Sequence, residues 1–246
     1  MVFKKQMNCY KNILKAVEEK RKLFAVLIDP EKCDLHKLEQ YVDAINTYHP
    51  DFVFIGGSQM QCSVNDAVAF LKNRVAIPVI LFPGNALQFS ENADAILLLS
   101  LISGRNAEFL IGQHVKAAKM LKNSSVEILP TGYILIEGGR ESATARISKT
   151  HPLSIEKSDE IVSTALAGEQ LGLRLIYLEA GSGAKCPVSQ TIIAATRAEI
   201  NVPLIVGGGI KTRQEMLSAY EAGADIVVVG NVLEDNPYYI AEFLYF

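Results

Sequence analysis

The sequence has little that would suit a nucleic-acid-binding, membrane-spanning or disulfide-bonded protein. The net charge of the 246 residues is only −3, so no basic field points to nucleic acid. No apolar run approaches the roughly 18 to 20 residues that cross a bilayer. The four cysteines lie far apart, without the spacing of a metal site, and no signal peptide stands at the N-terminus. We therefore expect free thiols and a cytoplasmic protein.

Two familiar catalytic arrangements are also missing. The sixth predicted strand ends Tyr-Leu-Glu, without the lysine that a Schiff-base aldolase needs at this position. No Ser–His–Asp arrangement is recognisable, because the four histidines fall on predicted helices or beside them, where we expect them at the surface. These histidines are His36, His49, His114 and His151.

What the sequence does have is an alternation of short apolar runs with segments of helical spacing, which is typical of βαβ units and a parallel sheet. Eight runs are predicted as strands: Leu23–Ile28, Phe52–Ile55, Val79–Phe82, Ala95–Leu99, Ile128–Ile136, Leu175–Leu178, Leu204–Val206 and Ile226–Val229. The predicted helices are Leu35–Tyr48, Ala107–Leu121, Ser158–Leu171, Ser189–Glu199 and Arg213–Ala222.

The third strand is followed by a different connection. Residues 83–93 are short and polar and leave no room for a normal helix. The length of the chain and its 49% hydrophobic residues suit a (β/α)₈ barrel. We predict an α/β fold, a modified (β/α)₈ TIM barrel with the third helix shortened or replaced, forming one domain over residues 1–246.

Glycines gather just after the last three predicted strands, at 181 and 183, at 207–209 and at 230. Glycines at such positions let backbone N–H groups approach a phosphate, and the last strands of a (β/α)₈ barrel often form a phosphate site. The sequence therefore predicts a phosphorylated small-molecule ligand.

Three polar side chains at strand ends are candidates for the chemistry. Asp29 follows the first strand, where it is either the N-cap of a turn or, with Ser58 at the end of the second, a ligand of Mg²⁺. Ser58 by itself would read as a loop serine. Glu179 at the end of the sixth strand is either a partly desolvated base or the partner of a nearby lysine or arginine.

Five motifs in order resemble the geranylgeranylglyceryl phosphate synthases of the PcrB-like family. They are Phe24–Lys32, Phe54–Ser58, Tyr177–Gly183, Val206–Ile210 and Val229–Asn231. The resemblance covers nearly the whole chain, and the segment Thr131–Arg140 is similar to the second, partly bacterial group of the family.

This resemblance implies a Mg²⁺-dependent prenyltransferase that joins geranylgeranyl or a similar prenyl diphosphate to the C3 hydroxyl of sn-glycerol 1-phosphate. It implies that Asp29 and Ser58 bind the metal, and that Glu179 and Tyr177 are catalytic, with Glu179 as the base. The implied glycerol-phosphate site consists of Tyr177, Leu178, Glu179, Ala180, Gly181, Ser182, Gly183, Gly208, Gly209, Gly230 and Asn231. A prenyl groove would draw its lining from Leu97, Leu98, Leu99, Leu101, Ile102, Phe82, Phe89 and Tyr133, any of which could equally be core.

Two other functions fit a phosphate-binding barrel. One is an enzyme of sugar-phosphate or thiamine-type biosynthesis, and the other is a non-catalytic barrel that binds a phosphorylated metabolite. The aromatic tail from Tyr238 to Phe246 predicts a final helix that caps the barrel or a subunit contact. We expect a homo-oligomer without nucleic acid, and at most transient contact with a membrane.

Overall fold

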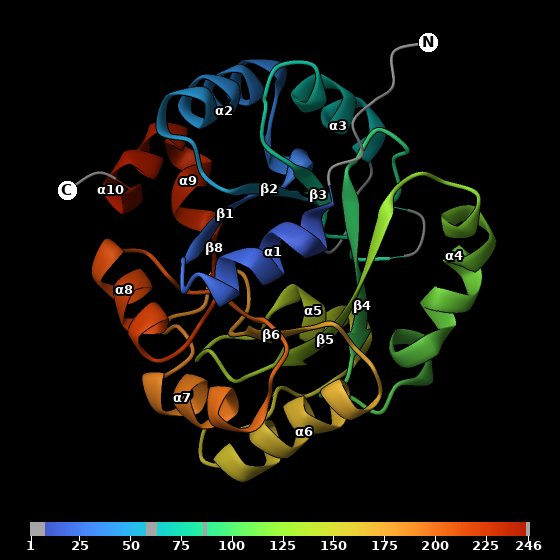
Figure 1. Ribbon diagram of the computed structural model, residues 1–246, viewed down its shortest axis with the longest axis vertical. Coiled ribbons are helices and arrows are strands. Elements are labelled where there is room, and N and C mark those ends of the chain that lie inside the picture. Colours follow the sequence, from blue (N-terminus) through green and yellow to red (C-terminus); the bar gives the residue numbers. More distant parts are fainter. Residues whose placement is uncertain (1–7, 58–62, 86–87, 245–246) are drawn as a thin grey trace.

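Eight parallel strands form a closed barrel in the computed structural model, which describes residues 8–57, 63–85 and 88–244 (Figure 1). Each strand pairs with the next along the chain, and β1 closes the ring by pairing with β8. The strands are β1 (Leu23–Ile28), β2 (Phe52–Ile55), β3 (Val79–Leu81), β4 (Ala95–Leu101), β5 (Glu127–Leu135), β6 (Leu175–Glu179), β7 (Leu204–Gly207) and β8 (Ile226–Val229). All eight predicted strands are confirmed, with ends that shift by at most two residues.

Helices surround this barrel (Figure 1). They are α1 (Cys9–Glu18), α2 (Leu35–Tyr48), α3 (Val64–Lys72), α4 (Gln113–Lys122), α5 (Ala143–Ser148), α6 (Ser158–Gln170), α7 (Gln190–Glu199), α8 (Arg213–Glu221), α9 (Asn231–Asp235) and α10 (Ala241–Leu244). Short turns of other helix types are η1 (Pro30–Lys32), η2 (Glu108–Gly112, a π-helix) and η3 (Pro237–Ile240). The five predicted helices are confirmed, whereas α1, α3, α5 and α9 had no counterpart in the prediction.

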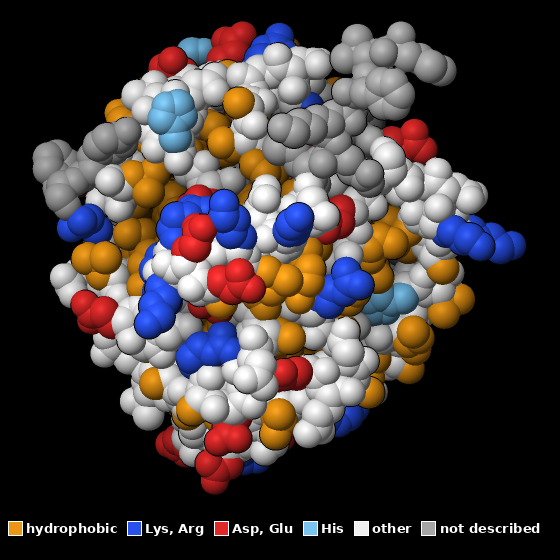
Figure 2. Space-filling view, viewed as in Figure 1, with side chains coloured by type: hydrophobic (Ala, Val, Ile, Leu, Met, Phe, Trp, Pro, Cys, Tyr) orange, Lys and Arg blue, Asp and Glu red, His pale blue; other side chains and the backbone are white. Residues whose placement is uncertain are grey.

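The core has two layers because neighbouring residues of a strand point to opposite faces of the sheet. The inner layer fills the barrel with side chains such as Ala25, Phe54 and Leu97, and the outer layer packs the strands against the helices. One end of the barrel is closed by α1, whose Ile13 and Ala16 belong to the inner layer. In the view of Figure 2, charged side chains cover this closed end. A ligand must therefore enter at the other end, where the strands finish.

The connection from β3 to β4 contains no helix in its described residues, 82–85 and 88–94. The prediction of a missing third helix agrees with this arrangement. The connection therefore adds no helix beside β4, whose outer face packs against α4, and a hollow remains between these elements.

The aromatic tail packs on the outside of the barrel. Phe243 of α10 is buried and stacks on Phe24 of β1, with 5.5 Å between the ring centroids. The tail is helical up to residue 244, as predicted, but α10 packs against the outer layer of β1 and does not cap an end of the barrel. No helix in the described part of the chain is both long and apolar enough to cross a membrane.

Candidate active site

Most of the predicted site residues line one hollow at the open end of the barrel, which we call the polar hollow. It is lined by Asp29, Lys32, Tyr133, Thr144, Tyr177, Glu179, Ser182, Gly183, Gly208, Gly209, Lys211, Gly230, Asn231 and Glu234, with several apolar neighbours. Strands β1, β6, β7 and β8 therefore bring together residues from both ends of the chain.

Three predicted binding residues do not line this hollow. Leu178 and Ala180 are buried in the outer layer, because they alternate with Tyr177 and Glu179 along the strand direction. Gly181 contributes through its backbone N–H, which contacts Glu179. Ser58 lies outside the described residues.

Glu179 is the last residue of β6 and is only 5% exposed. Its Oε1 accepts a hydrogen bond of 2.7 Å from the backbone N–H of Gly181. Burial raises the pKa of Glu179 to about 7, although the Gly181 amide and the hydroxyls of Tyr177 and Tyr133 lower it. No lysine or arginine of the described chain forms an ion pair with it. Such a carboxylate can take up a proton near neutral pH, as a general base requires.

Two tyrosines stand beside this carboxylate. Tyr133 of β5 and Tyr177 of β6 have ring centroids 5.3 Å apart, and Phe82 packs against both rings. The hydroxyl of Tyr177 is buried and has no well-formed hydrogen bond to any described residue. A side chain at position 207 would collide with that hydroxyl, which explains the glycine there. The Tyr177 hydroxyl thus lies beside the base, where it lowers the pKa of the Glu179 carboxyl.

The glycine clusters allow the loops after β6 and β7 to pack closely. Gly208 has a φ of +77°, and a Cβ at this position would collide with Oε1 of Glu179. A Cβ on Gly209 would lie 2.9 Å from the backbone of Cys186. Side chains larger than glycine are excluded here, so backbone groups form this wall of the hollow, as in an anion site.

Asn231 ties the end of β8 to the loop after β6. Its Oδ1 accepts hydrogen bonds from the Ser182 hydroxyl at 3.1 Å and from the backbone N–H of Gly183 at 2.8 Å. These contacts fix the loop over the hollow, so Asn231 has a defined structural task in the predicted phosphate site.

Asp29 caps a turn, which is one of the two roles that the sequence left open, and it also lies at the polar hollow. Its Oδ1 caps η1 by accepting a 3.2 Å hydrogen bond from the Glu31 N–H, and the side chain also lines the polar hollow. Burial raises the pKa of Asp29, because the Lys32 ammonium, 3.9 Å away, offsets the lost hydration only in part. A cation in the hollow would relieve this cost.

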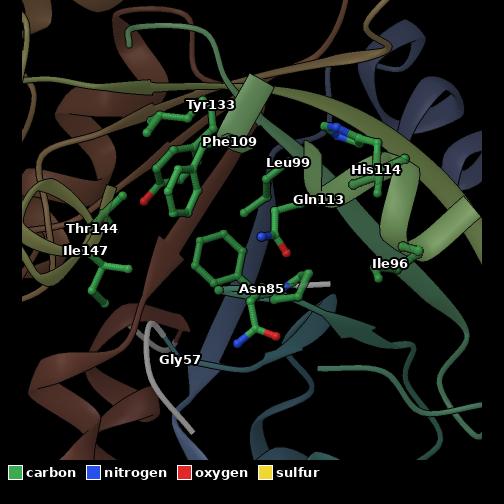
Figure 3. Close-up of a pocket in the computed structure, with 16 residues that line it drawn as sticks. Gly57, Asn85, Ile96, Leu99, Phe109, Gln113, His114, Tyr133, Thr144 and Ile147 are labelled. Carbon is green, nitrogen blue, oxygen red and sulfur yellow. The ribbon is translucent and has the colours of Figure 1, made fainter. Parts of the chain in front are cut away.

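A second hollow adjoins the first, and we call it the apolar hollow (Figure 3). It lies between β4, η2 and α4 and the segment after β3, and it shares Gly57, Phe82, Tyr133 and Thr144 with the polar hollow. Its remaining lining is Pro83, Gly84, Asn85, Ile96, Leu98, Leu99, Leu101, Phe109, Gln113, His114, Ala117 and Ile147. Ile96 and Leu98 belong to the outer layer of β4, so the hollow extends over the strand where the third helix is missing.

Five of the eight residues proposed for a groove line the apolar hollow: Phe82, Leu98, Leu99, Leu101 and Tyr133. Leu97 and Ile102 are core residues, and Phe89 packs against the core. The prediction of a surface role holds for three histidines but is wrong for His114. Its ring is half-buried beside the apolar hollow, with Nε2 3.3 Å from the Ser100 hydroxyl, and burial lowers its pKa.

Sequence reasoning missed four polar residues of the polar hollow. Lys32, Thr144 and Glu234 were not proposed, and Lys211 was left aside as the start of a helix. Position after a strand was a usable signal for Lys211, which follows the β7 glycines closely. Thr144 lies on α5, which had no predicted counterpart.

The family model of PcrB proteins matches residues 15–245. The chain belongs to the PcrB family. Among its relatives, the geranylgeranylglyceryl phosphate synthase of Spirosoma linguale is 51% identical over 218 residues, which cover 88% of both chains. That of Zunongwangia profunda is 48% identical over 230 residues, covering 92% of this chain and 97% of the relative.

A solved structure agrees with this membership of the PcrB family. The enzyme of Thermoplasma acidophilum, (S)-3-O-geranylgeranylglyceryl phosphate synthase in complex with its substrate sn-glycerol 1-phosphate, matches with a TM-score of 0.89 and 30% identity. The match covers 97% of this chain and 98% of the other. The PcrB barrel of this chain is therefore that of a family of prenyltransferases.

Proposed function

We propose that this protein transfers a long prenyl group from its diphosphate to the C3 hydroxyl of sn-glycerol 1-phosphate, releasing diphosphate and forming an ether. The observation that carries the proposal is the union of two unlike hollows. The polar hollow suits a phosphorylated acceptor, and the adjoining apolar hollow suits a hydrocarbon chain. The reacting atoms would meet where the two join, beside Phe82 and Tyr133.

The acceptor phosphate would bind the backbone groups after β6, β7 and β8, which involve Gly183, Gly208, Gly209 and the loop fixed by Asn231. The relative from Thermoplasma acidophilum was solved with sn-glycerol 1-phosphate, which supports this choice of acceptor. Holding the phosphate fixes the hydroxyl relative to the electrophilic carbon and so lowers the entropic part of the barrier.

Glu179 would take the proton of the C3 hydroxyl as the new C–O bond forms. Its raised pKa matches this task, because a carboxyl with a pKa of about 7 is present in both protonation states at neutral pH and can both accept and release a proton. The Tyr177 hydroxyl would donate a hydrogen bond to the acceptor or to the carboxylate, and thereby orient one against the other.

Mg²⁺ is the cation that fits the Asp29 side of the hollow. Asp29 is a half-buried carboxylate with a raised pKa, and Mg²⁺ commonly binds through one or two carboxylates while substrate phosphates and water complete its shell. Asp29 would hold the ion together with Ser58, as the family resemblance implies. When bound, the ion supplies charge stabilisation to the departing diphosphate.

A transfer assay tests the proposal. Purified protein receives sn-glycerol 1-phosphate, Mg²⁺ and one prenyl diphosphate at a time, of increasing length, and the ether product is measured. Wild-type protein should form product only with Mg²⁺, and Asp29→Asn and Glu179→Gln should each reduce the rate by at least about 100-fold. Absence of product with every prenyl diphosphate, from a folded protein that binds glycerol phosphate, would reject the proposal.

Three further predictions belong with this function. We propose that the protein acts in the cytoplasm as a homo-oligomer, and that it contacts membranes only transiently to deliver its lipid-like product. The exposed Tyr238 and Tyr239 of the tail offer one surface for a subunit contact. Sedimentation of the purified protein checks the oligomeric state.

A further inference from the structure

The polar hollow must hold two anions at once if the proposed function is correct, namely the acceptor phosphate and the donor diphosphate. Among the described residues that line it, only Lys32 and Lys211 carry a positive charge. Lys211 follows the glycines of β7, beside the wall assigned to the acceptor phosphate. Lys32 ends η1, three residues after Asp29. The two cations therefore follow different strands, β7 and β1, which are separated in the ring by β8.

Lys32 is held by a specific partner. Its Nζ lies 2.7 Å from Oε1 of Glu234 in α9, whereas Oδ2 of Asp29 is 3.9 Å away. The Lys32 side chain is 42% exposed and that of Glu234 27%. Ion pairs with such access to solvent contribute little to stability, so removing this one should cost the fold little.

Glu234, the partner of Lys32, belongs to the network that fixes the loop after β6. Oε1 of Glu234 accepts a 3.0 Å hydrogen bond from Nδ2 of Asn231, and Oδ1 of the same amide holds Ser182 and Gly183. A continuous chain of contacts thus leads from Lys32 through Glu234 and Asn231 to the loop after β6. An ammonium group placed in this way faces the space between Asp29 and the glycine wall.

We propose that Lys32 is a further ligand of the donor diphosphate, and that Glu234 is a positioning residue that holds it there. As the bond between C1 of the prenyl group and the diphosphate oxygen breaks, the electron pair stays on that oxygen. Lys32 donates hydrogen bonds to the oxygens on which this charge grows. At the same time the C3 hydroxyl oxygen of glycerol phosphate forms a bond to C1, and the proton of this hydroxyl goes to Glu179. The inference rests on the proposed function for the identity of the donor.

The test combines kinetics with binding of inorganic diphosphate. Lys32→Met keeps the length of the side chain and removes its charge, and Lys32→Arg restores the charge. Glu234→Gln keeps an acceptor for Asn231 but loses the ion pair. Lys15→Met is the matched control, because Lys15 pairs with Glu19 on α1 at the closed end of the barrel. Transfer rates are measured for each variant, and inorganic diphosphate with Mg²⁺ is titrated calorimetrically into each protein.

Lys32→Met should lower kcat about 100-fold, as removal of one preorganised donor does, while KM for glycerol phosphate changes less than about twofold. Its affinity for inorganic diphosphate should fall about tenfold, and Lys32→Arg should recover most of both losses. Glu234→Gln should weaken diphosphate binding by about threefold to fivefold, less than Lys32→Met. Lys15→Met should match wild type.

Lys32 would instead be a structural residue if Lys32→Met stays within about threefold of wild type in kcat and diphosphate affinity, even when its melting temperature falls. That result would overturn the inference and leave the proposed function intact. If wild-type protein transfers no prenyl group at all, the proposed function fails, and the titration then decides alone. Diphosphate binding that depends on Lys32 would support the assignment, and binding indifferent to Lys32 would overturn it.

Discussion

The polar and apolar hollows lie at the same end of one barrel, yet they are built in different ways. The polar hollow is formed largely by residues at or just past the ends of β6, β7, β8 and β1, which include glycines, a glutamate and an aspartate. The apolar hollow is formed by β4 itself and by α4. It lies beside the connection from β3 to β4, which has no helix in its described residues. The polar half of the site therefore depends on the residues at the strand ends, and the apolar half on the absence of a helix between β3 and β4 in the described residues.

This difference has a chemical consequence. Backbone groups and short side chains around Glu179 create a place where charge can be held and a proton moved. Apolar side chains such as Leu99 and Phe109 carry no charge, and they would bind a hydrocarbon by burying apolar surface away from water. Changes in the two halves should consequently affect different substrates, and this separation can be tested one half at a time.

The largest effect is expected at Glu179. Glu179→Gln should lower the transfer rate about 1,000-fold, because the amide cannot act as the base. For wild type, kcat/KM should fall about tenfold per pH unit below the Glu179 pKa of about 7 and level off above it, since the base must be deprotonated. A pH–rate profile measures this limb, and a rate that is flat across the pH range on both sides of that pKa would contradict the assignment.

The same variant should be more stable than wild type in mildly alkaline solution. The folded-state pKa of Glu179 is raised from 4.5 to about 7, so the folded protein binds more protons than the unfolded chain between these values. Stability is therefore lost as the pH rises through this window, by about 3 kcal/mol for a shift of this size. Thermal melts inside this pH window and above it check the sign. The melting temperature of Glu179→Gln should rise relative to that of wild type as the pH rises.

Gly208→Ala should lower kcat/KM for glycerol phosphate about 100-fold, because the new Cβ would collide with the Glu179 carboxylate and displace it from the acceptor. Gly172→Ala is the matched control, because its φ of +87° imposes similar strain while a Cβ there meets nothing within 4 Å. Both variants should lose stability, but only Gly208→Ala should lose acceptor binding in a calorimetric titration. Equal activity of the two variants would show that strain alone is at work.

A smaller effect is expected in the apolar half. Leu99→Asn should raise KM for a long prenyl diphosphate about tenfold and leave the KM for glycerol phosphate unchanged, because it places a polar group against the hydrocarbon. Leu171→Asn, at a leucine that is 78% exposed, serves as the control. If Leu99→Asn raises the KM for glycerol phosphate as much as the KM for the prenyl diphosphate, the two hollows are not separate sites.

The sequence predicted the strands and picked out most of the residues that line the polar hollow, for a physical reason. A parallel strand buried on both faces is a local apolar run, and the glycines, Asp29 and Glu179 stand at the ends of such runs. Position after a strand is sufficient to bring them together, since all strands of the barrel finish at one end.

The apolar half could not be predicted in the same way. Leu97 and Leu99 look alike in sequence, but only Leu99 lines the hollow, because the outcome depends on the side chains that pack against β4. His114 was misjudged for the same reason, since its burial comes from contact between α4 and Ser100 of β4. Lys32 reads as part of a turn until its contact with Glu234, 202 residues away, is known.

A crystal structure with both sn-glycerol 1-phosphate and a non-reactive thiodiphosphate analogue of the prenyl donor would test the two-hollow arrangement most directly. We expect the acceptor phosphate against Gly183 and Gly208, its C3 hydroxyl within hydrogen-bond distance of Glu179, and the hydrocarbon along β4 beside Leu99. A C3 hydroxyl turned away from Glu179, or a prenyl chain that leaves the site by any route other than the apolar hollow, would contradict it.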